Sequence, residues 1–161
     1  MKVEQRLADL AVGLLAVGLL EPGDRAAVAR EAQVAGVGGQ GLRERAGVRA
    51  PHLRGAAVVD AGGNLIAFGR MDGAEIAGPV LAVDKAYTAV ANRTSTEELG
   101  RLAAPGGELF GLQANGGGRF VIFGGGVPLR ADGVIVGAVG VSGASTADDI
   151  GCAGAAAAAF G

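Results

Sequence analysis

The sequence has few of the residues on which metal sites, disulfides and catalytic triads depend. Among its 161 residues there is no tryptophan, and cysteine, histidine and tyrosine occur once each. The single Cys152 excludes an internal disulfide and a cysteine-rich zinc site, and it is compatible with a reducing cytoplasm. The single His52 has no second histidine with which to form a zinc site. We therefore expect no metal site and no Ser/His hydrolase.

The chain also has no large excess of positive or negative charge. The formal net charge is −2, whereas a nucleic-acid-binding domain normally carries a basic stripe, so we expect no nucleic-acid partner. Half of the residues are hydrophobic, but many of them are small, and 31 are glycine. Small side chains let backbones approach closely, which indicates tight packing and an interface between copies of the chain.

The amino-terminal segment is apolar from Leu7 to Leu20 but is interrupted by Asp9. A secretion signal is one interpretation, yet the following Glu21-Pro22-Gly23-Asp24 is no small-residue cleavage site. The run is also shorter than the roughly 20 residues that a membrane span needs. We expect a helix at about residues 3–20 that is buried or lies at an interface of a cytoplasmic protein without a membrane partner.

The remaining pattern predicts one α+β domain over residues 1–161, with an antiparallel sheet and helices packed on it. Short glycine-rich turns separate five expected strands, at residues 56–60, 65–68, 119–123, 127–130 and 134–141. Further helices are expected at residues 25–45, 79–92, 94–103 and, starting at Ser145 or Thr146, to Phe160.

The expected helix at residues 79–92 carries the side chains best suited to chemistry. Lys85 lies among small alanines, so its stem would be partly buried, and it could act as a base or as an amine towards a carbonyl. Tyr87 or Asp72 would then be the acid. The alternatives are a salt bridge from Lys85 that closes the helix onto the loop at residues 70–72, with Asp72 and Asp84 as nearby carboxylates, and a core position for Tyr87, on one apolar face with Val80, Val83 and Val90.

Two further features suit the binding of a small ligand. Arg70 follows an expected strand, where its guanidinium could hold a carboxylate, or it could pair with Asp72 or Asp84. Gly124, Gly125 and Gly126 lead into a strand rather than a helix, so they are no phosphate loop. Their backbone is free of side chains, which predicts close approach of a flat ligand or a neighbouring subunit.

Five stretches together resemble the GlcG/HbpS family of small haem-binding proteins, which is also similar to the carboxyl-terminal domain of PduO-type adenosyltransferases. They lie at residues 58–63, 70–74, 84–89, 105–113 and 124–143. The resemblance covers roughly residues 55–160, and the helix at about 3–20 is an addition to the family pattern. It implies a profilin-like fold with a five-stranded antiparallel sheet and a tendency to form rings or octamers. The apolar helix at about 3–20 likewise predicts an oligomer, a tetramer or octamer.

The resemblance leaves two functions open. In the first, a homo-oligomer binds haem or another small ligand, with Arg70, Met71, Thr88 and the glycines at 124–126 as contacts. His52 lies in a link that departs from the family pattern, which leaves Tyr87, Met71 or Thr88 as candidate iron ligands. In the second, a cofactor-independent isomerase, lyase or cyclase acts on a small carbonyl or carboxylate metabolite through Lys85, Tyr87 and Asp72.

Overall fold

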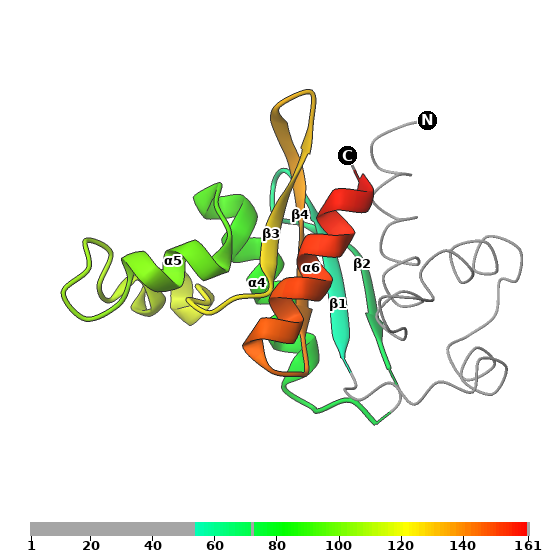
Figure 1. Ribbon diagram of the computed structural model, residues 1–161, viewed down its shortest axis with the longest axis horizontal. Helices are drawn as coiled ribbons and strands as arrows, with labels where there is room; N and C mark the ends of the chain where they lie inside the picture. The colour runs from blue at the N-terminus through cyan, green and yellow to red at the C-terminus, as the bar shows by residue number, and fades with distance from the viewer. Residues whose placement is uncertain (1–53, 72, 161) are drawn as a thin grey trace, which may run out of the picture.

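A four-stranded antiparallel sheet forms the centre of the part of the protein that the structure describes. The computed structural model describes residues 54–71 and 73–160. Its strands lie in the order β2-β1-β4-β3 (Figure 1), and their bounds are β1 (Gly55–Asp60), β2 (Leu65–Arg70), β3 (Gly126–Ala131) and β4 (Val134–Ser142). The expected helices at residues 3–20 and 25–45, His52 and Asp72 lie outside the described residues.

Both hairpins are closed by the turn residues that the sequence predicts. The Asp60 carboxylate accepts hydrogen bonds from the N–H groups of Gly62 (2.8 Å) and Asn64 (2.9 Å), which folds the chain back into β2. Asp132 and Gly133 have φ angles of 50° and 78°, as the tight turn between β3 and β4 requires. Four of the five expected strands are therefore confirmed.

The fifth expected strand, at residues 119–123, is wrong. In the described part of the chain this segment joins no sheet. The Val121 N–H donates to the Thr88 hydroxyl oxygen at 3.0 Å, so this backbone group bonds to a helix rather than to a neighbouring strand. The sheet of the described residues has four strands, and the profilin-like assignment stays a prediction.

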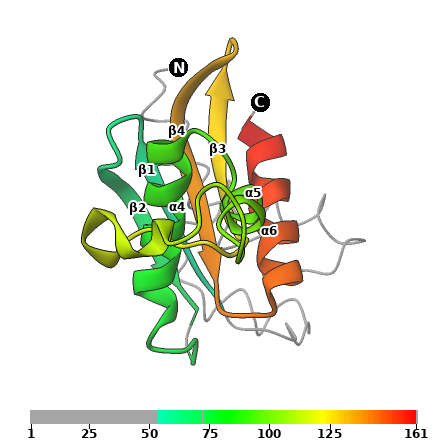
Figure 2. The ribbon, with the colours of Figure 1, turned by 90° about the vertical axis from the view of Figure 1, so that its left-hand side faces the viewer.

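Two long helices cover opposite faces of the sheet (Figures 1 and 2). Helix α4 (Gly78–Asn92) packs against Ala138 of β4, whereas α6 (Thr146–Phe160) packs against the neighbouring Val139. Successive side chains of a strand point to opposite faces, so these two residues separate the two halves of the core. The expected bounds of both helices are confirmed to within one residue.

Helix α4 lies unusually close to the sheet. A Cβ at Gly140 of β4 would lie 2.0 Å from the carbonyl oxygen of Ala82, so only glycine fits beneath the helix. The face that meets the sheet carries small residues and Lys85, and Val80, which we expected on an apolar core face, is 64% exposed. The expectation failed because close approach selects side chains by size as well as by hydrophobicity.

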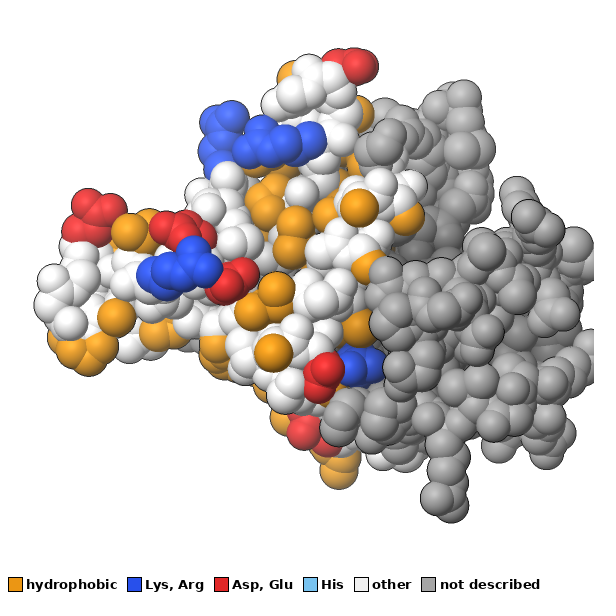
Figure 3. Space-filling view, in the orientation of Figure 1, with side chains coloured by type: hydrophobic (Ala, Val, Ile, Leu, Met, Phe, Trp, Pro, Cys, Tyr) orange, Lys and Arg blue, Asp and Glu red, His pale blue; other side chains and the backbone are white. Residues whose placement is uncertain are grey.

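Helix α5 (Thr96–Leu102) belongs to a projection beside the main body (Figure 1). The Ser95 hydroxyl caps it by accepting the Glu98 N–H at 3.2 Å. Acidic and basic side chains are interspersed over the face seen in Figure 3, and on α5 Arg101 pairs with Glu97 and Glu98. No helix within the described ranges has the length and apolar character needed to cross a membrane.

Candidate functional site

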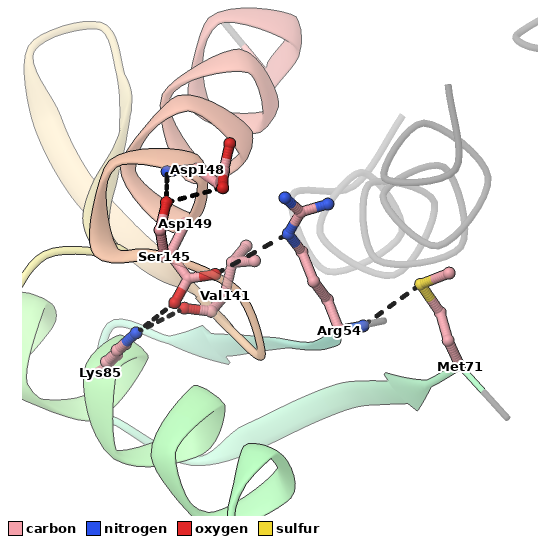
Figure 4. A network of polar contacts seen from close by, with 7 residues as sticks. All are labelled: Arg54, Met71, Lys85, Val141, Ser145, Asp148 and Asp149. Carbon is pink, nitrogen blue, oxygen red and sulfur yellow. Dashed lines mark hydrogen bonds and ion pairs between the residues drawn. The ribbon is translucent and has the colours of Figure 1, made fainter. Parts of the chain in front are cut away.

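Lys85 is buried in an ion pair. Its ammonium group donates to Asp149 Oδ2 and to the Val141 carbonyl oxygen, both at 2.9 Å (Figure 4). The Phe123 ring lies 4.9 Å from the same nitrogen, and Lys85 as a whole is 1% exposed. Among the described residues the partner is therefore Asp149 rather than Asp84, whereas Asp72 lies outside them, and the pair joins α4 to the first turn of α6. Its role as a base or amine stays a prediction.

Asp149 also links Lys85 to the start of β1. Its Oδ1 lies 3.8 Å from Nε of Arg54, whose backbone N–H donates to the Met71 sulfur at 3.3 Å (Figure 4). The sulfur of Met71 thus points into the protein, and the residue is 6% exposed. A role as iron ligand would require Met71 to leave this contact.

Sequence reasoning missed Asp149 and Arg54. Asp149 lies in the first turn of α6 and belongs to the buried stripe of that helix, Asp149, Ala153, Ala156 and Phe160. Those spacings of three and four are the signal that could have identified it, because a carboxylate in a packed stripe needs a buried cation.

The space beside the three glycines is filled by the chain itself. A Cβ at Gly124 would lie 2.3 Å from the Ile150 side chain, and one at Gly126 would lie 2.4 Å from the Lys85 carbonyl oxygen. A Cβ at Gly125, where φ is 118°, would lie 2.9 Å from Lys85 Nζ. The three glycines thus allow α4 and α6 to approach this segment of the backbone closely. Ligand contact at these glycines stays a prediction.

The hydroxyl of Thr88 has two backbone partners. It donates to the Arg119 carbonyl oxygen at 3.2 Å and accepts the Val121 N–H at 3.0 Å, and Thr88 is 0% exposed. Thr88 therefore fastens the segment at residues 119–121 to α4. An iron ligand at this position would have to break both hydrogen bonds, and that role stays a prediction.

Tyr87 belongs to an open cluster that sequence reasoning did not assemble. The Arg119 guanidinium lies 3.8 Å above its ring, and Arg119 Nε donates to Asp84 Oδ1 at 2.9 Å. Phe120 stacks on Tyr87 with 6.3 Å between the ring centroids. Asp84 therefore pairs with Arg119 rather than with Lys85 or Arg70. Arg119 is separated from Asp84 by 35 positions, so no local pattern could have revealed the contact.

Arg70 is the last residue of β2, which is an edge strand of the sheet, and its side chain is exposed. It pairs across the ladder with Gly55, just as Phe68 pairs with Ala57 and Leu65 with Val59. Val59 packs under α4, so these three side chains of β2 point to the α4 side of the sheet. Leu65 is 52% and Phe68 39% exposed. Arg70 is exposed and makes no ion pair with another described residue.

The exposed apolar side chains on this side, together with the half-buried Tyr87, form a strip between β2 and α4. An added Cβ on Gly55 would lie 3.4 Å from the Phe68 ring and 3.5 Å from Gly78, and one on Gly63 would lie 2.8 Å from the Tyr87 ring. The strip therefore runs from the first turn of α4 to Tyr87, and we call it the α4–β2 strip. Its members are Leu65, Phe68, Val80 and Tyr87.

The two groups of residues differ in what they can do chemically. The Lys85–Asp149–Arg54 network is closed to solvent and joins secondary-structure elements. The α4–β2 strip is open, apolar and bordered by the guanidinium groups of Arg70 and Arg119, which suits a flat apolar ligand with carboxylates. Within residues 54–71 and 73–160 there is no cluster of three metal-ligating side chains.

Comparison with known proteins points to one family. The family model described as "Haem degrading protein HbpS-like" matches residues 32–158. An uncharacterized 15.0 kDa protein of Citrobacter freundii is 45% identical over 92 residues, which are 57% of this chain and 65% of that protein. The corrinoid adenosyltransferase PduO of Salmonella typhimurium is 42% identical over 93 residues, 58% of this chain but only 28% of that protein.

A solved structure shares both the sequence and the fold. The crystal structure of the PduOC:heme complex is 36% identical, with a TM-score of 0.67. The similarity covers 87% of this chain and 94% of that one. The similarity to full-length PduO is thus confined to part of that protein, whereas almost all of the haem-bound chain is matched.

Proposed function

The chain belongs to the HbpS-like family, and from that premise we propose that it is a haem-binding protein. The observation that carries the proposal is the 36% identity to a chain crystallised with haem, over 94% of that chain. The corrinoid adenosyltransferase activity of PduO is not part of the proposal, because the match spans 28% of that enzyme.

The α4–β2 strip is the part of the described surface that fits haem. A porphyrin offers a flat apolar face with both carboxylates at one edge. The strip offers exposed Leu65, Phe68 and Val80, with a guanidinium at either end that could hold that edge. Tyr87 supplies the candidate iron ligand, because its phenol oxygen has no hydrogen bond to another described residue and tyrosinate is a known haem ligand. Bound haem would supply an iron centre, and the strip would shield one of its faces from water.

Haemin titration followed by the Soret band tests this proposal. We expect a shifted band that saturates at one haem per chain, and a non-saturating, featureless spectrum would contradict it. Val80 and Val134 form a matched pair, since each is 64% exposed but only Val80 lies on the strip. Val80→Asp should weaken haem binding at least tenfold, whereas Val134→Asp should leave it unchanged. Equal effects of the two variants would remove the strip from the site.

The alternative of a cofactor-independent enzyme stays a prediction for Lys85. The geometry favours haem binding over it, because a substrate could reach the Lys85 amine only by separating a 2.9 Å ion pair in a residue that is 1% exposed.

We also propose that the protein acts as a homo-oligomer, a tetramer or octamer, in the cytoplasm. Exposed apolar side chains such as Ile76 (88%) and Phe110 (65%) support an interface between copies. Light scattering of the full chain tests the assembly, and a soluble monomer would contradict it. Deleting residues 1–20, which lie outside the described part, should lower the oligomeric state.

A further inference from the structure

Three residues of α4 hold Arg119 in place. Its Nε donates to Asp84 (2.9 Å), its guanidinium lies over Tyr87 (3.8 Å), and its carbonyl oxygen accepts from Thr88 (3.2 Å). These three partners occupy positions i, i+3 and i+4 of α4 and therefore lie on one side of the helix. Both the backbone and the side chain of Arg119 are thus fixed before any ligand arrives.

The outer edge of this guanidinium is unused. The Arg119 side chain is 43% exposed, and of its three nitrogens only Nε has a hydrogen-bond partner in the described part of the chain. The neighbouring Gly116, Gly117 and Gly118 have φ angles of 61°, 68° and 82° and carry no side chains that could cover it. Two η nitrogens therefore face solvent beside an aromatic surface formed by Tyr87 and Phe120.

We propose that Arg119 and Tyr87 form a carboxylate-binding subsite for a ligand with a flat apolar body. A fixed guanidinium fork binds a carboxylate through two charge-assisted hydrogen bonds, and its prior immobilisation reduces the entropy lost on binding. The adjacent rings contact the apolar body. Asp84 takes only the Nε edge, so it orients the fork without occupying it. Arg70 has no such support, which makes Arg119 the stronger candidate for this role.

The identity of the ligand rests on the proposed function: the carboxylates would be the propionates of haem. The existence of the subsite does not rest on it, because a small carboxylate should bind there alone. Two experiments therefore separate the two claims.

Tyr87 provides a site-specific probe for the first experiment. It is the only tyrosine in a chain without tryptophan, so tyrosine emission reports on this cluster alone. Cyclohexanecarboxylate should change the emission of the full-length protein in a saturable manner, and the uncharged cyclohexanecarboxamide should not. Arg119→Gln should abolish the response, and Arg119→Lys, which keeps the charge but loses the fork, should weaken it. Arg130→Gln, at an exposed arginine on the β3–β4 hairpin, is the control.

The subsite is refuted if the wild-type protein does not respond, if the amide acts like the acid, or if the response survives in a folded Arg119→Gln protein. It is equally refuted if Arg70→Gln, rather than Arg119→Gln, removes the response. Circular dichroism establishes folding, and Arg119→Lys serves as the test if the glutamine variant does not fold.

The second experiment compares haemin with its dimethyl ester, in which both propionates are neutral. Arg119→Gln should weaken haemin binding about tenfold, the loss expected for a charge-assisted hydrogen bond, and should leave binding of the ester unchanged. Haem binding that is unaffected by Arg119→Gln would overturn the assignment of the propionates to this subsite and leave the proposed function standing. A carboxylate response without any haem binding would overturn the proposed function alone.

Discussion

Lys85 of α4 and Asp149 of α6 form an ion pair 2.9 Å long, although their helices lie on opposite faces of the sheet. The pair is formed where Gly125 lacks a side chain, because a Cβ there would lie 2.9 Å from the Lys85 nitrogen. The glycine run at residues 124–126 therefore makes room for the buried ion pair of Lys85. This ion pair joins α4 to α6.

Replacing Lys85 by methionine should destabilise the protein by about 3–5 kcal/mol, because the Asp149 carboxylate would stay buried without its cation. Chemical denaturation measures this loss. Arg101→Met removes an exposed cation, 64% exposed, from its pairs with Glu97 and Glu98 and should cost at most about 1 kcal/mol. Similar losses in the two variants would show that the Lys85 pair is not structural. A folded Lys85→Met protein of full stability would reopen a catalytic role.

Replacing Gly140 by alanine should destabilise the protein by at least about 1–3 kcal/mol, because the new methyl group would force α4 away from the sheet. The matched control is Gly154→Ala in α6, where nothing lies within 4 Å of the added Cβ. That change should stabilise the protein by up to about 1 kcal/mol through helix propensity. Thermal unfolding of both variants provides the comparison. A change in stability of the same sign in both variants would contradict the close packing of α4 on the sheet.

Thr88→Val should cost about 1–3 kcal/mol, because it leaves the buried N–H of Val121 without its acceptor. Thr88→Ser retains the hydroxyl and should lose only the smaller contribution of one methyl group. Amide hydrogen exchange at Val121 checks the cause, since protection should fall in the valine variant and persist in the serine variant. Unchanged protection in Thr88→Val would exclude the hydroxyl as the fastening group.

Asp60 should contribute a pH-dependent term to stability. Hydrogen bonds from the Asn64 side chain, and then from its backbone, hold the pKa of the Asp60 carboxyl below its usual range. A lowered folded pKa stabilises the protein above the unfolded value of about 3.9, and this contribution is lost as the pH falls through the folded pKa. Asn64→Ala should raise the Asp60 pKa in an NMR titration and lower stability at neutral pH but not in strong acid. An unchanged pKa would contradict the role of Asn64.

The sequence predicted only part of the α4–β2 strip. The sequence placed Tyr87 on one helix face with Val80, and it placed Arg70 just after a strand, whereas Arg70 is the last residue of β2. It did not reveal that this face is open to solvent. Helical periodicity identifies an apolar face but does not show whether another layer of structure covers that face. In α4 the face that packs on the sheet carries the smaller residues, and the face with Val80 is left exposed.

What the sequence determined by itself is the position of the tight turns and helices in the described chain. Asp132-Gly133 encodes a tight turn, and Pro79 and Ser95 mark helix starts, because each effect acts within a few residues. Only the tertiary structure decided which charged groups meet. Lys85 and Asp149 are 64 positions apart, and Arg119 and Asp84 are 35 apart. Such partners are selected by burial, because a charge that packing removes from water must find an opposite charge nearby, wherever along the chain that charge lies.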